Sequence, residues 1–171
     1  MKNGIYEKTT KPIYILNQST KISKVVVKNE NNEIPPILSK ILNGWCDFEI
    51  GKDICFSASY ITDVPLDVLD AILDYSKKMT CLVTFDGEGF IVSLLITETT
   101  TFILVDDNEY KCFVIDCISP KVIIKNLFYC IKDNVSSWAK FLVDYDGSNE
   151  KELENEILKK IKEIENVYSN L

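Results

Sequence analysis

Residues 45–60 show the clearest alternation of apolar and polar side chains in the chain. Residues 45–50 (WCDFEI) follow the two-residue period of a half-buried strand. Gly51 and Lys52 then supply a turn, and residues 54–60 predict the returning strand. This part of the chain therefore predicts a β-hairpin.

The segment after this hairpin predicts a helix over residues 64–78. Its apolar side chains recur three or four positions apart, as on the buried face of a helix: Val68, Leu69, Ile72 and Leu73. Thr62 or Asp63 can cap the N-terminus, and Pro65 fits the first turn.

Four further strands are predicted with no helix between them. They cover residues 80–85, 90–97, 101–105 and 109–118. The segments that connect them are short and contain the Asp, Gly, Asn and Thr residues typical of hairpin turns. Because such short connections join antiparallel neighbours, we expect a meander.

The N-terminal part of the chain has weaker patterns. Residues 1–20 are polar and are expected to be loosely ordered, apart from a short strand at 13–16. A strand is predicted at 22–28, where three consecutive valines favour β-structure. A double proline then begins a short predicted helix over residues 35–43, with Gly44 in the C′ position.

The C-terminal third predicts helices. Ser119 and Pro120 resemble an N-cap and first helical residue, and Trp138 and Phe141 indicate a further helical turn or two. Residues 150–168 predict a charged amphipathic helix. Its apolar stripe comprises Leu153, Ile157, Ile161, Ile164 and Tyr168.

Strands bounded by helices are typical of the α+β class. We expect residues 1–171 to form a single α+β domain, because no repeat or linker divides the chain. The expected architecture is an antiparallel meander sheet of about five or six strands, with helices packed mainly on one face. The strand at 80–85 should lie antiparallel to the strand that follows it.

The amino-acid composition excludes several kinds of catalytic and ligand-binding groups. The 171 residues are 46% hydrophobic and 26% charged, as in ordinary globular domains. All 19 basic residues are lysine, and histidine is absent. The chain therefore has no imidazole base, no histidine metal ligand and no guanidinium clamp for phosphate. We expect no catalytic activity and no cofactor.

The formal net charge of −7 argues against nucleic acid as a partner, because affinity for nucleic acid comes largely from basic residues at the phosphates. The first residues (MKNGIYE) lack the apolar core of a signal peptide. No stretch approaches 18 uninterrupted apolar residues, so no membrane span is expected. These features predict a cytoplasmic protein.

The six cysteines form no C-x-x-C pair, and the chain has no histidine to complete a zinc site. Each one lies in an apolar run, where free cysteine behaves as a small buried hydrophobic residue. We therefore expect six reduced, buried thiols: Cys46, Cys55, Cys81, Cys112, Cys117 and Cys130.

Four aspartates form an acidic stripe on one face of the predicted helix 64–78: Asp63, Asp67, Asp70 and Asp74. The stripe can dock a basic protein, because complementary charge speeds association. It can also be an ordinary solvated face. The nearest predicted counter-charges are Lys77 and Lys78, in the last turn of the same helix. Reversing Asp67, Asp70 and Asp74 to lysine is expected to leave the fold intact and to slow association.

Other constellations have simpler explanations. The acidic loops at 86–89 and 106–109 lack the EF-hand pattern and fit hairpin turns better than calcium sites. Two scattered carboxylates can form a glycosidase-like pair only if they face one cleft. Trp45, Tyr60 and Trp138 are more often packing residues than binding anchors, although exposed aromatics favour interfaces.

Residues 45–88 also resemble a known group of proteins. A strand led by Trp45 and Phe48 is followed by Ser59-Tyr60-Ile61-Thr62-Asp63, the apolar helix that begins near Pro65, and a strand ending in Phe85-Asp86-x-Glu88. This arrangement is similar to small bacterial immunity-like proteins of polymorphic toxin systems. In these proteins, a Ser-Tyr-[Leu/Ile]-[Ser/Thr]-Asp segment leads from a strand into a helix. The resemblance implies a protein that binds and blocks a cognate toxin.

Three functional hypotheses follow. The first is a non-catalytic binding protein that occludes a cognate basic toxin through the acidic stripe. The second is a structural or assembly protein that self-associates through a sheet edge or the C-terminal helix. The third is a carboxylate-based hydrolase, which requires a deep cleft with two acids. The oligomeric state stays open in all three.

Overall fold

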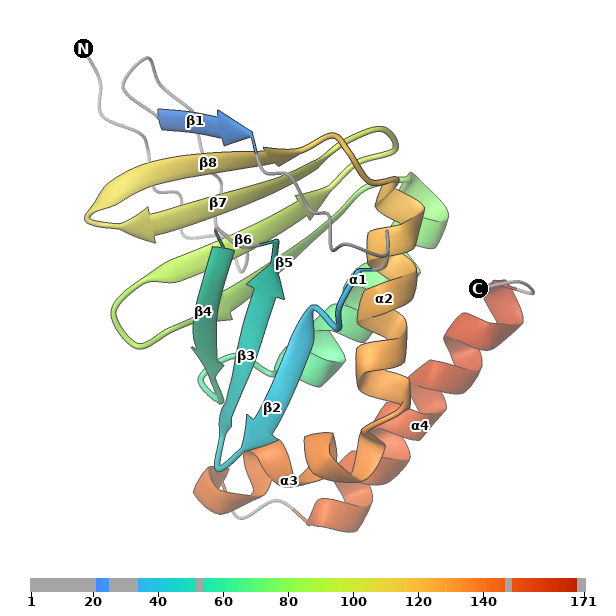
Figure 1. The fold of residues 1–171 in the computed structure, drawn as a ribbon. Coiled ribbons are helices and arrows are strands. Elements are labelled where there is room, and N and C mark those ends of the chain that lie inside the picture. The colour runs from blue at the N-terminus through green and yellow to red at the C-terminus, as the bar shows by residue number, and fades with distance from the viewer. Residues whose placement is uncertain (1–20, 25–33, 52–53, 147–148, 169–171) are drawn as a thin grey trace.

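The computed structural model describes residues 21–24, 34–51, 54–146 and 149–168 (Figure 1). The expected strand at 13–16 and the order of residues 1–20 lie outside the described residues, as does residue range 25–28 of the expected strand at 22–28. The described strands are β1 (Lys21–Lys24), β2 (Leu38–Leu42), β3 (Trp45–Ile50), β4 (Ile54–Ser59), β5 (Cys81–Asp86), β6 (Ile91–Ile96), β7 (Thr101–Asp107) and β8 (Glu109–Ile115). The helices are α1 (Val64–Lys78), α2 (Pro120–Lys132), α3 (Val135–Asp146) and α4 (Glu150–Val167).

Strands β5 to β8 form the predicted antiparallel meander, in which each strand pairs with the next. Strand β5 is antiparallel to β6, as expected, with Cys81 opposite Ile96. The sheet has a fifth strand, because β1 lies parallel to β8 at its edge. A parallel pair needs a long connection instead of a hairpin, and residues 25–108 separate β1 from β8 in the chain.

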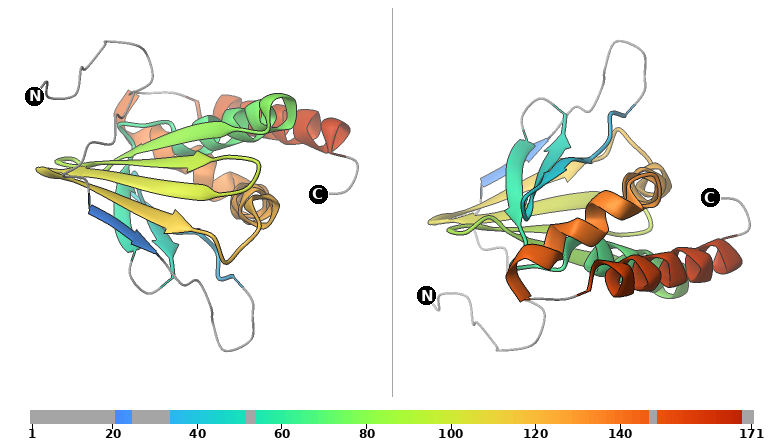
Figure 2. Two further views of the ribbon diagram at one scale, coloured as in Figure 1. Left: turned by 90° about the horizontal axis from the view of Figure 1, so that it is seen from above. Right: turned by 90° about the horizontal axis from the view of Figure 1, so that it is seen from below.

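The α+β class is confirmed, but the single meander sheet is not. Strands β2, β3 and β4 form a separate three-stranded antiparallel sheet. It stands across the five-stranded sheet, as Figure 2 shows from two directions. Phenylalanine rings fill the junction: the Phe48 ring is 4.6 Å from Phe56 and 5.2 Å from Phe85. Packing of these rings joins the smaller sheet to β5 of the larger one.

The predicted helix over residues 35–43 is wrong. Strand β2 occupies residues 38–42, and Leu42 pairs with Trp45 across a two-residue turn. Asn43 and Gly44 form this turn with φ angles of 50° and 77°. Positive φ at both central positions defines the type I′ turn, which Asn-Gly favours and whose twist matches that of the flanking strands. Gly44 therefore closes a hairpin and does not end a helix.

Helix α1 has the predicted bounds. The Leu66 amide donates to the Asp63 carboxylate (3.3 Å), so Asp63 is the N-cap. Helix α4 also agrees with the prediction. Ile157, Ile161 and Ile164 of its apolar stripe are buried, and the two end residues of the stripe are half-buried.

The helices connect the two sheets. Helix α1 contacts β5 of the larger sheet, whereas α2 and α3 contact β2 of the smaller one. Helix α4 packs against both α1 and α3 (Figures 1 and 2). One cluster of buried side chains extends from Ile37, the residue that precedes β2 in the chain, to Ile164 in α4.

Candidate functional site

The acidic stripe of α1 is only partly open to a partner. Asp63 is half-buried as the N-cap of α1. Burial raises the pKa of the Asp63 carboxyl to about 6, and the negative charges of Asp67 and Glu156 act in the same direction. Folding thus brings two charged residues of α4 close to the start of α1: Glu156, and Lys160, whose positive charge acts in the opposite direction.

Two other members of the stripe have lysine partners. The Lys160 ammonium of α4 lies 2.5 Å from the Asp70 carboxylate, and Lys78 lies 3.2 Å from Asp74. The expectation that only Lys77 and Lys78 supply nearby positive charge is therefore wrong. Reversal of Asp70 would also break a contact between α1 and α4, so Asp70 is a poor choice for a surface test.

The two most exposed large hydrophobic side chains of the described residues lie at one end of the three-stranded sheet. Leu42 is 68% exposed and Ile61 is 57% exposed. Half-buried Trp45 pairs with Leu42 across the hairpin, and the Tyr60 amide donates to the Gly44 carbonyl (2.8 Å). We call Leu42, Trp45 and Ile61 the turn patch. The sequence does not predict the turn patch, because the pattern of residues 35–43 favours a helix in place of β2.

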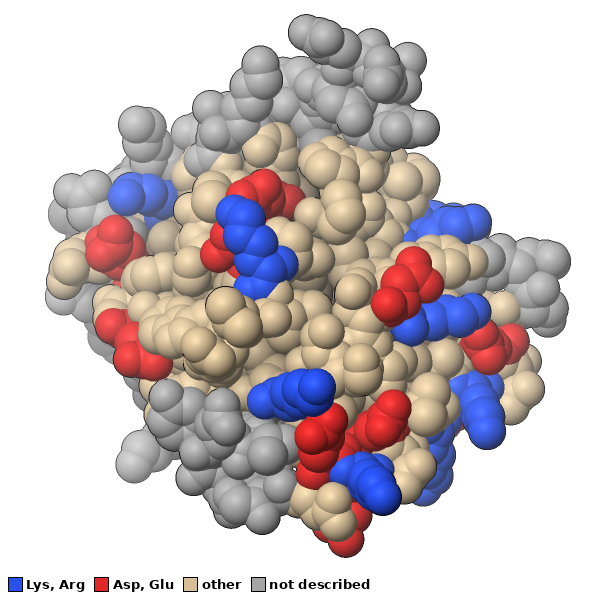
Figure 3. Space-filling view, turned by 60° about the horizontal axis from the view of Figure 1, so that its bottom comes forward, with Lys and Arg blue, Asp and Glu red and all other residues tan. Residues whose placement is uncertain are grey.

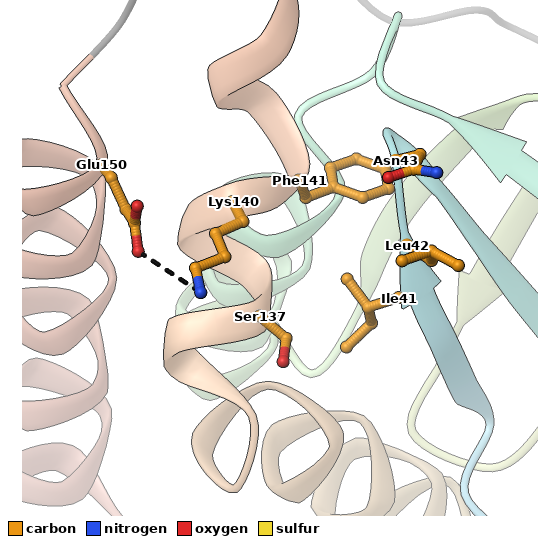
Figure 4. Close-up of a pocket in the computed structure, with 7 residues that line it drawn as sticks. All are labelled: Ile41, Leu42, Asn43, Ser137, Lys140, Phe141 and Glu150. Atoms are coloured by element: carbon orange, nitrogen blue, oxygen red, sulfur yellow. Dashed lines mark ion pairs between the residues drawn. The ribbon is translucent and has the colours of Figure 1, made fainter.

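A hollow of about 430 Å³ lies beside the turn patch (Figure 4). Its walls come from the end of β2 and its turn, from α3 and from the first residue of α4. The lining side chains are Ile41, Leu42, Asn43, Ser137, Lys140, Phe141 and Glu150. Figure 4 shows Lys140 and Glu150 facing one another on one side of α3, with Ile41 and Leu42 on the other side and Ser137 between them.

A second hollow of about 320 Å³ lies where β4 meets the five-stranded sheet. Most of its lining is apolar, and Phe56, Phe90 and Phe113 supply aromatic walls. Asp107 and Lys111 are the charged residues among those that line it. Each of the two hollows has one lining carboxylate, so neither provides the carboxylate pair of a glycosidase.

The outer face of the three-stranded sheet has a polar network that local sequence patterns do not predict either. The Lys40 ammonium lies 2.7 Å from Asp47 and 3.7 Å from Glu49, and the Ser57 hydroxyl donates to Asp47 (3.0 Å). The hydrogen bond from Lys40 lowers the pKa of the Asp47 carboxyl. Lys40 has a positive φ of 50°, where the pairing of β2 with β3 shifts register. The one lysine of this network therefore offsets only one of its two carboxylate charges.

All six cysteines keep their thiols outside any disulfide, but the expectation that all are buried is wrong. Four are buried, whereas Cys55 and Cys117 are exposed. Burial raises the pKa of the Cys46 thiol to about 12. Burial, together with the Glu49 charge, also raises the pKa of Cys55. Neither thiol has the lowered pKa that activates a cysteine nucleophile.

The aromatic residues named from the sequence have different environments. Trp138 is fully buried, and its indole N–H donates to the Cys130 carbonyl (3.0 Å). Tyr60 is half-buried and packs against the core. Of the three residues, Trp45 is the one that belongs to the turn patch.

The described part of the chain contains no group of histidine, cysteine, aspartate and glutamate side chains that could hold a metal ion. Among the described helices, none combines the length and the apolar character needed to cross a membrane.

Comparisons with family models, curated proteins and solved structures find no match for this chain. The resemblance of residues 45–88 to immunity-like proteins therefore stays a prediction.

Proposed function

We propose that this protein is a non-catalytic binding protein that occludes a basic protein partner, as immunity proteins of polymorphic toxin systems do. The observation that carries the proposal is the turn patch. Large apolar side chains gathered at one surface mark sites of protein association more often than scattered ones do. Tryptophans such as the half-buried Trp45 are also enriched among the residues that contribute most to binding.

The surroundings of the turn patch support a protein partner. Seen from this end of the molecule, much of the surface is uncharged, and many of its acidic and basic side chains lie next to one another (Figure 3). The centres of protein interfaces are depleted in charged residues, whereas their rims are polar. An adjacent hollow of about 430 Å³ provides space for a side chain of the partner.

The charge distribution supports a basic partner. The chain has a net charge of −7. Asp67 and Glu156 are exposed carboxylates close to Asp63 at the start of α1, where Lys160 is a nearby positive charge. A net negative charge disfavours folding slightly but attracts a positively charged protein and speeds its association.

The first experiment tests the turn patch. Leu42→Asp combined with Ile61→Asp should fold normally, because both side chains are largely exposed. The probe is the protein encoded next to this gene, measured by growth rescue when the two are co-expressed and by binding kinetics. The double variant should lose rescue and bind at least tenfold more weakly. Val122→Asp, at a 45% exposed apolar residue of α2, is the matched control and should change neither.

Unchanged rescue and binding in the double variant would contradict this use of the turn patch. A stable homo-oligomer that dissociates in the same variant would favour the assembly hypothesis instead. Size-exclusion chromatography with light scattering distinguishes these outcomes.

The second experiment tests the charge. Asp67→Lys combined with Glu156→Lys should slow association with the same partner and reduce its dependence on salt between low and physiological ionic strength. Glu88→Lys combined with Glu98→Lys, at exposed positions outside the acidic stripe and α4, makes the same change in net charge and is the control. Equal association rates in all three proteins would show that the partner is not selected by its charge.

A further inference from the structure

We infer that the hollow beside the turn patch receives one long basic side chain, arginine or lysine, from the partner. This inference rests on the proposed function for the identity of the partner. The hollow itself combines an apolar wall with oxygen acceptors and a carboxylate, the two kinds of surface that such a side chain requires.

The apolar wall comes from the end of β2. Ile41 and Leu42 lie together on one side of α3 in Figure 4, and Leu42 remains 68% exposed in this chain. Long basic side chains bury their methylene stems against such surfaces while the charged group stays polar. Contact with the stem would therefore cover the most exposed apolar side chain of the described residues.

The polar part of the hollow suits a cation. The Glu150 carboxylate can accept a charge-assisted hydrogen bond, and the Ser137 hydroxyl and the Asn43 amide oxygen are further acceptors in the lining. A guanidinium has five N–H donors in a plane and can use several of these acceptors at once. Arginine should therefore bind better than lysine.

Lys140 is the present partner of Glu150, but it holds the carboxylate weakly. The distance between its ammonium and the carboxylate is 3.9 Å, whereas charge-assisted hydrogen bonds are typically about 2.7–2.9 Å long. Both side chains are well exposed, at 66% and 45%, and exposed pairs of this kind contribute little. A cation from the partner can therefore replace Lys140, and removal of Lys140 should strengthen binding.

The test uses a probe that needs no identified partner. N-acetyl-L-arginine amide is titrated into the isotope-labelled protein, and the backbone amide signals are followed by NMR. We expect saturable shifts at Asn43, Ser137 and Glu150. The uncharged analogue N-acetyl-L-citrulline amide should bind at least threefold more weakly. Glu150→Gln should weaken arginine binding at least threefold, and Lys140→Met should strengthen it about threefold.

Glu165→Gln is the matched control. Glu165 is also 45% exposed and also pairs with a lysine, Lys132, on another helix. This variant should leave the affinity for the probe unchanged. Absence of saturable shifts at the hollow, equal binding of arginine and citrulline amides, or equal effects of the two glutamate variants would overturn the inference.

The two proposals can fail separately. If the probe does not bind but the turn-patch variants abolish partner binding, the inference is wrong and the proposed function stands. If the probe binds as expected but the adjacent gene product does not, the proposed function is wrong and the hollow still recognises a basic group.

Discussion

The Lys160 ammonium of α4 and the Asp70 carboxylate of α1 lie 2.5 Å apart, although 90 residues separate them in the chain. Asp70 is 58% exposed, whereas Lys160 is only 21% exposed. The lysine therefore lies in the seam between the helices and reaches outward to the aspartate. This contact changes the acidic stripe from a uniform negative face to one that α4 partly neutralises.

We predict a modest contribution of this ion pair to stability. Double-mutant cycles of exposed pairs typically give about 0.2–1 kcal/mol of coupling. Asp70→Asn, Lys160→Met and the double variant should show coupling in this range when urea unfolding is measured at low salt. The coupling should shrink in 0.5 M NaCl, where charges are screened. Coupling that does not change with salt would contradict an electrostatic origin.

The raised pKa of Asp63 predicts a pH dependence of stability. The folded pKa of about 6 exceeds the ordinary value of about 3.9, so folding favours the protonated carboxyl. This favourable contribution is fully present below about pH 4 and is lost as the pH rises through about 6. Asn caps helices as well as Asp does and carries no charge.

Asp63→Asn should therefore be more stable than the wild type at pH 7.5, and the difference should disappear towards pH 4. Urea unfolding across this pH range measures both proteins under the same conditions, so other titrating groups largely cancel. A difference that is the same at pH 4.5 and pH 7.5 would rule out Asp63 as the origin.

Trp138 should be among the residues most important for stability. It is fully buried, its ring lies 5.3 Å from Phe141, and its N–H donates to the Cys130 carbonyl. Trp138→Ala should cost about 3–5 kcal/mol, the range for large-to-small changes of buried aromatics. Trp138→Phe should cost less, because the Asn134 amide also donates to that carbonyl. Equilibrium unfolding in urea measures both values.

The turn at Asn43 and Gly44 should tolerate one substitution and resist another. Gly44→Ala places a side chain at a φ of 77°, which costs roughly 1–2 kcal/mol. Asn43→Gly should change stability little, since glycine adopts positive φ without strain. Comparable losses in both variants would contradict the type I′ assignment. A destabilised Gly44→Ala protein should also lose order at Leu42, which NMR can detect.

The thiols should divide into two groups. Cys55 and Cys117 are exposed and should react with a thiol reagent in the folded protein, whereas the other four should react only after denaturation. All six should be detected in denaturant without added reductant. Cys55 should react slowly for an exposed thiol, because its raised pKa leaves little thiolate at neutral pH.

Several elements could be predicted from local sequence because their cause is local. Asp63 and Pro65 mark the start of α1, and its apolar spacing gives its buried face, so its bounds agree with the prediction. The meander β5–β8 follows from alternation and short turns, which can join only antiparallel neighbours.

Strand β2 shows where local patterns conflict. Leu38, Ile41 and Leu42 have helical spacing, and Gly44 fits the end of a helix. The same Asn43-Gly44 pair is also the strongest short signal for a hairpin. The choice between them depends on whether Trp45 has a strand partner on that side, and this is a tertiary property.

The candidate site depended on tertiary structure most of all. The negative charge, the absence of histidine and arginine, and the acidic stripe can all be read from the amino-acid sequence. Only the fold brought Lys160 to Asp70, Glu156 close to Asp63, and Glu150 to the hollow beside Leu42. In each case a residue of α4 meets a partner far away in the chain. Such contacts form because the apolar stripe of α4 is buried against α1 and α3. Local periodicity predicts this stripe, but it does not show which surface the stripe packs against.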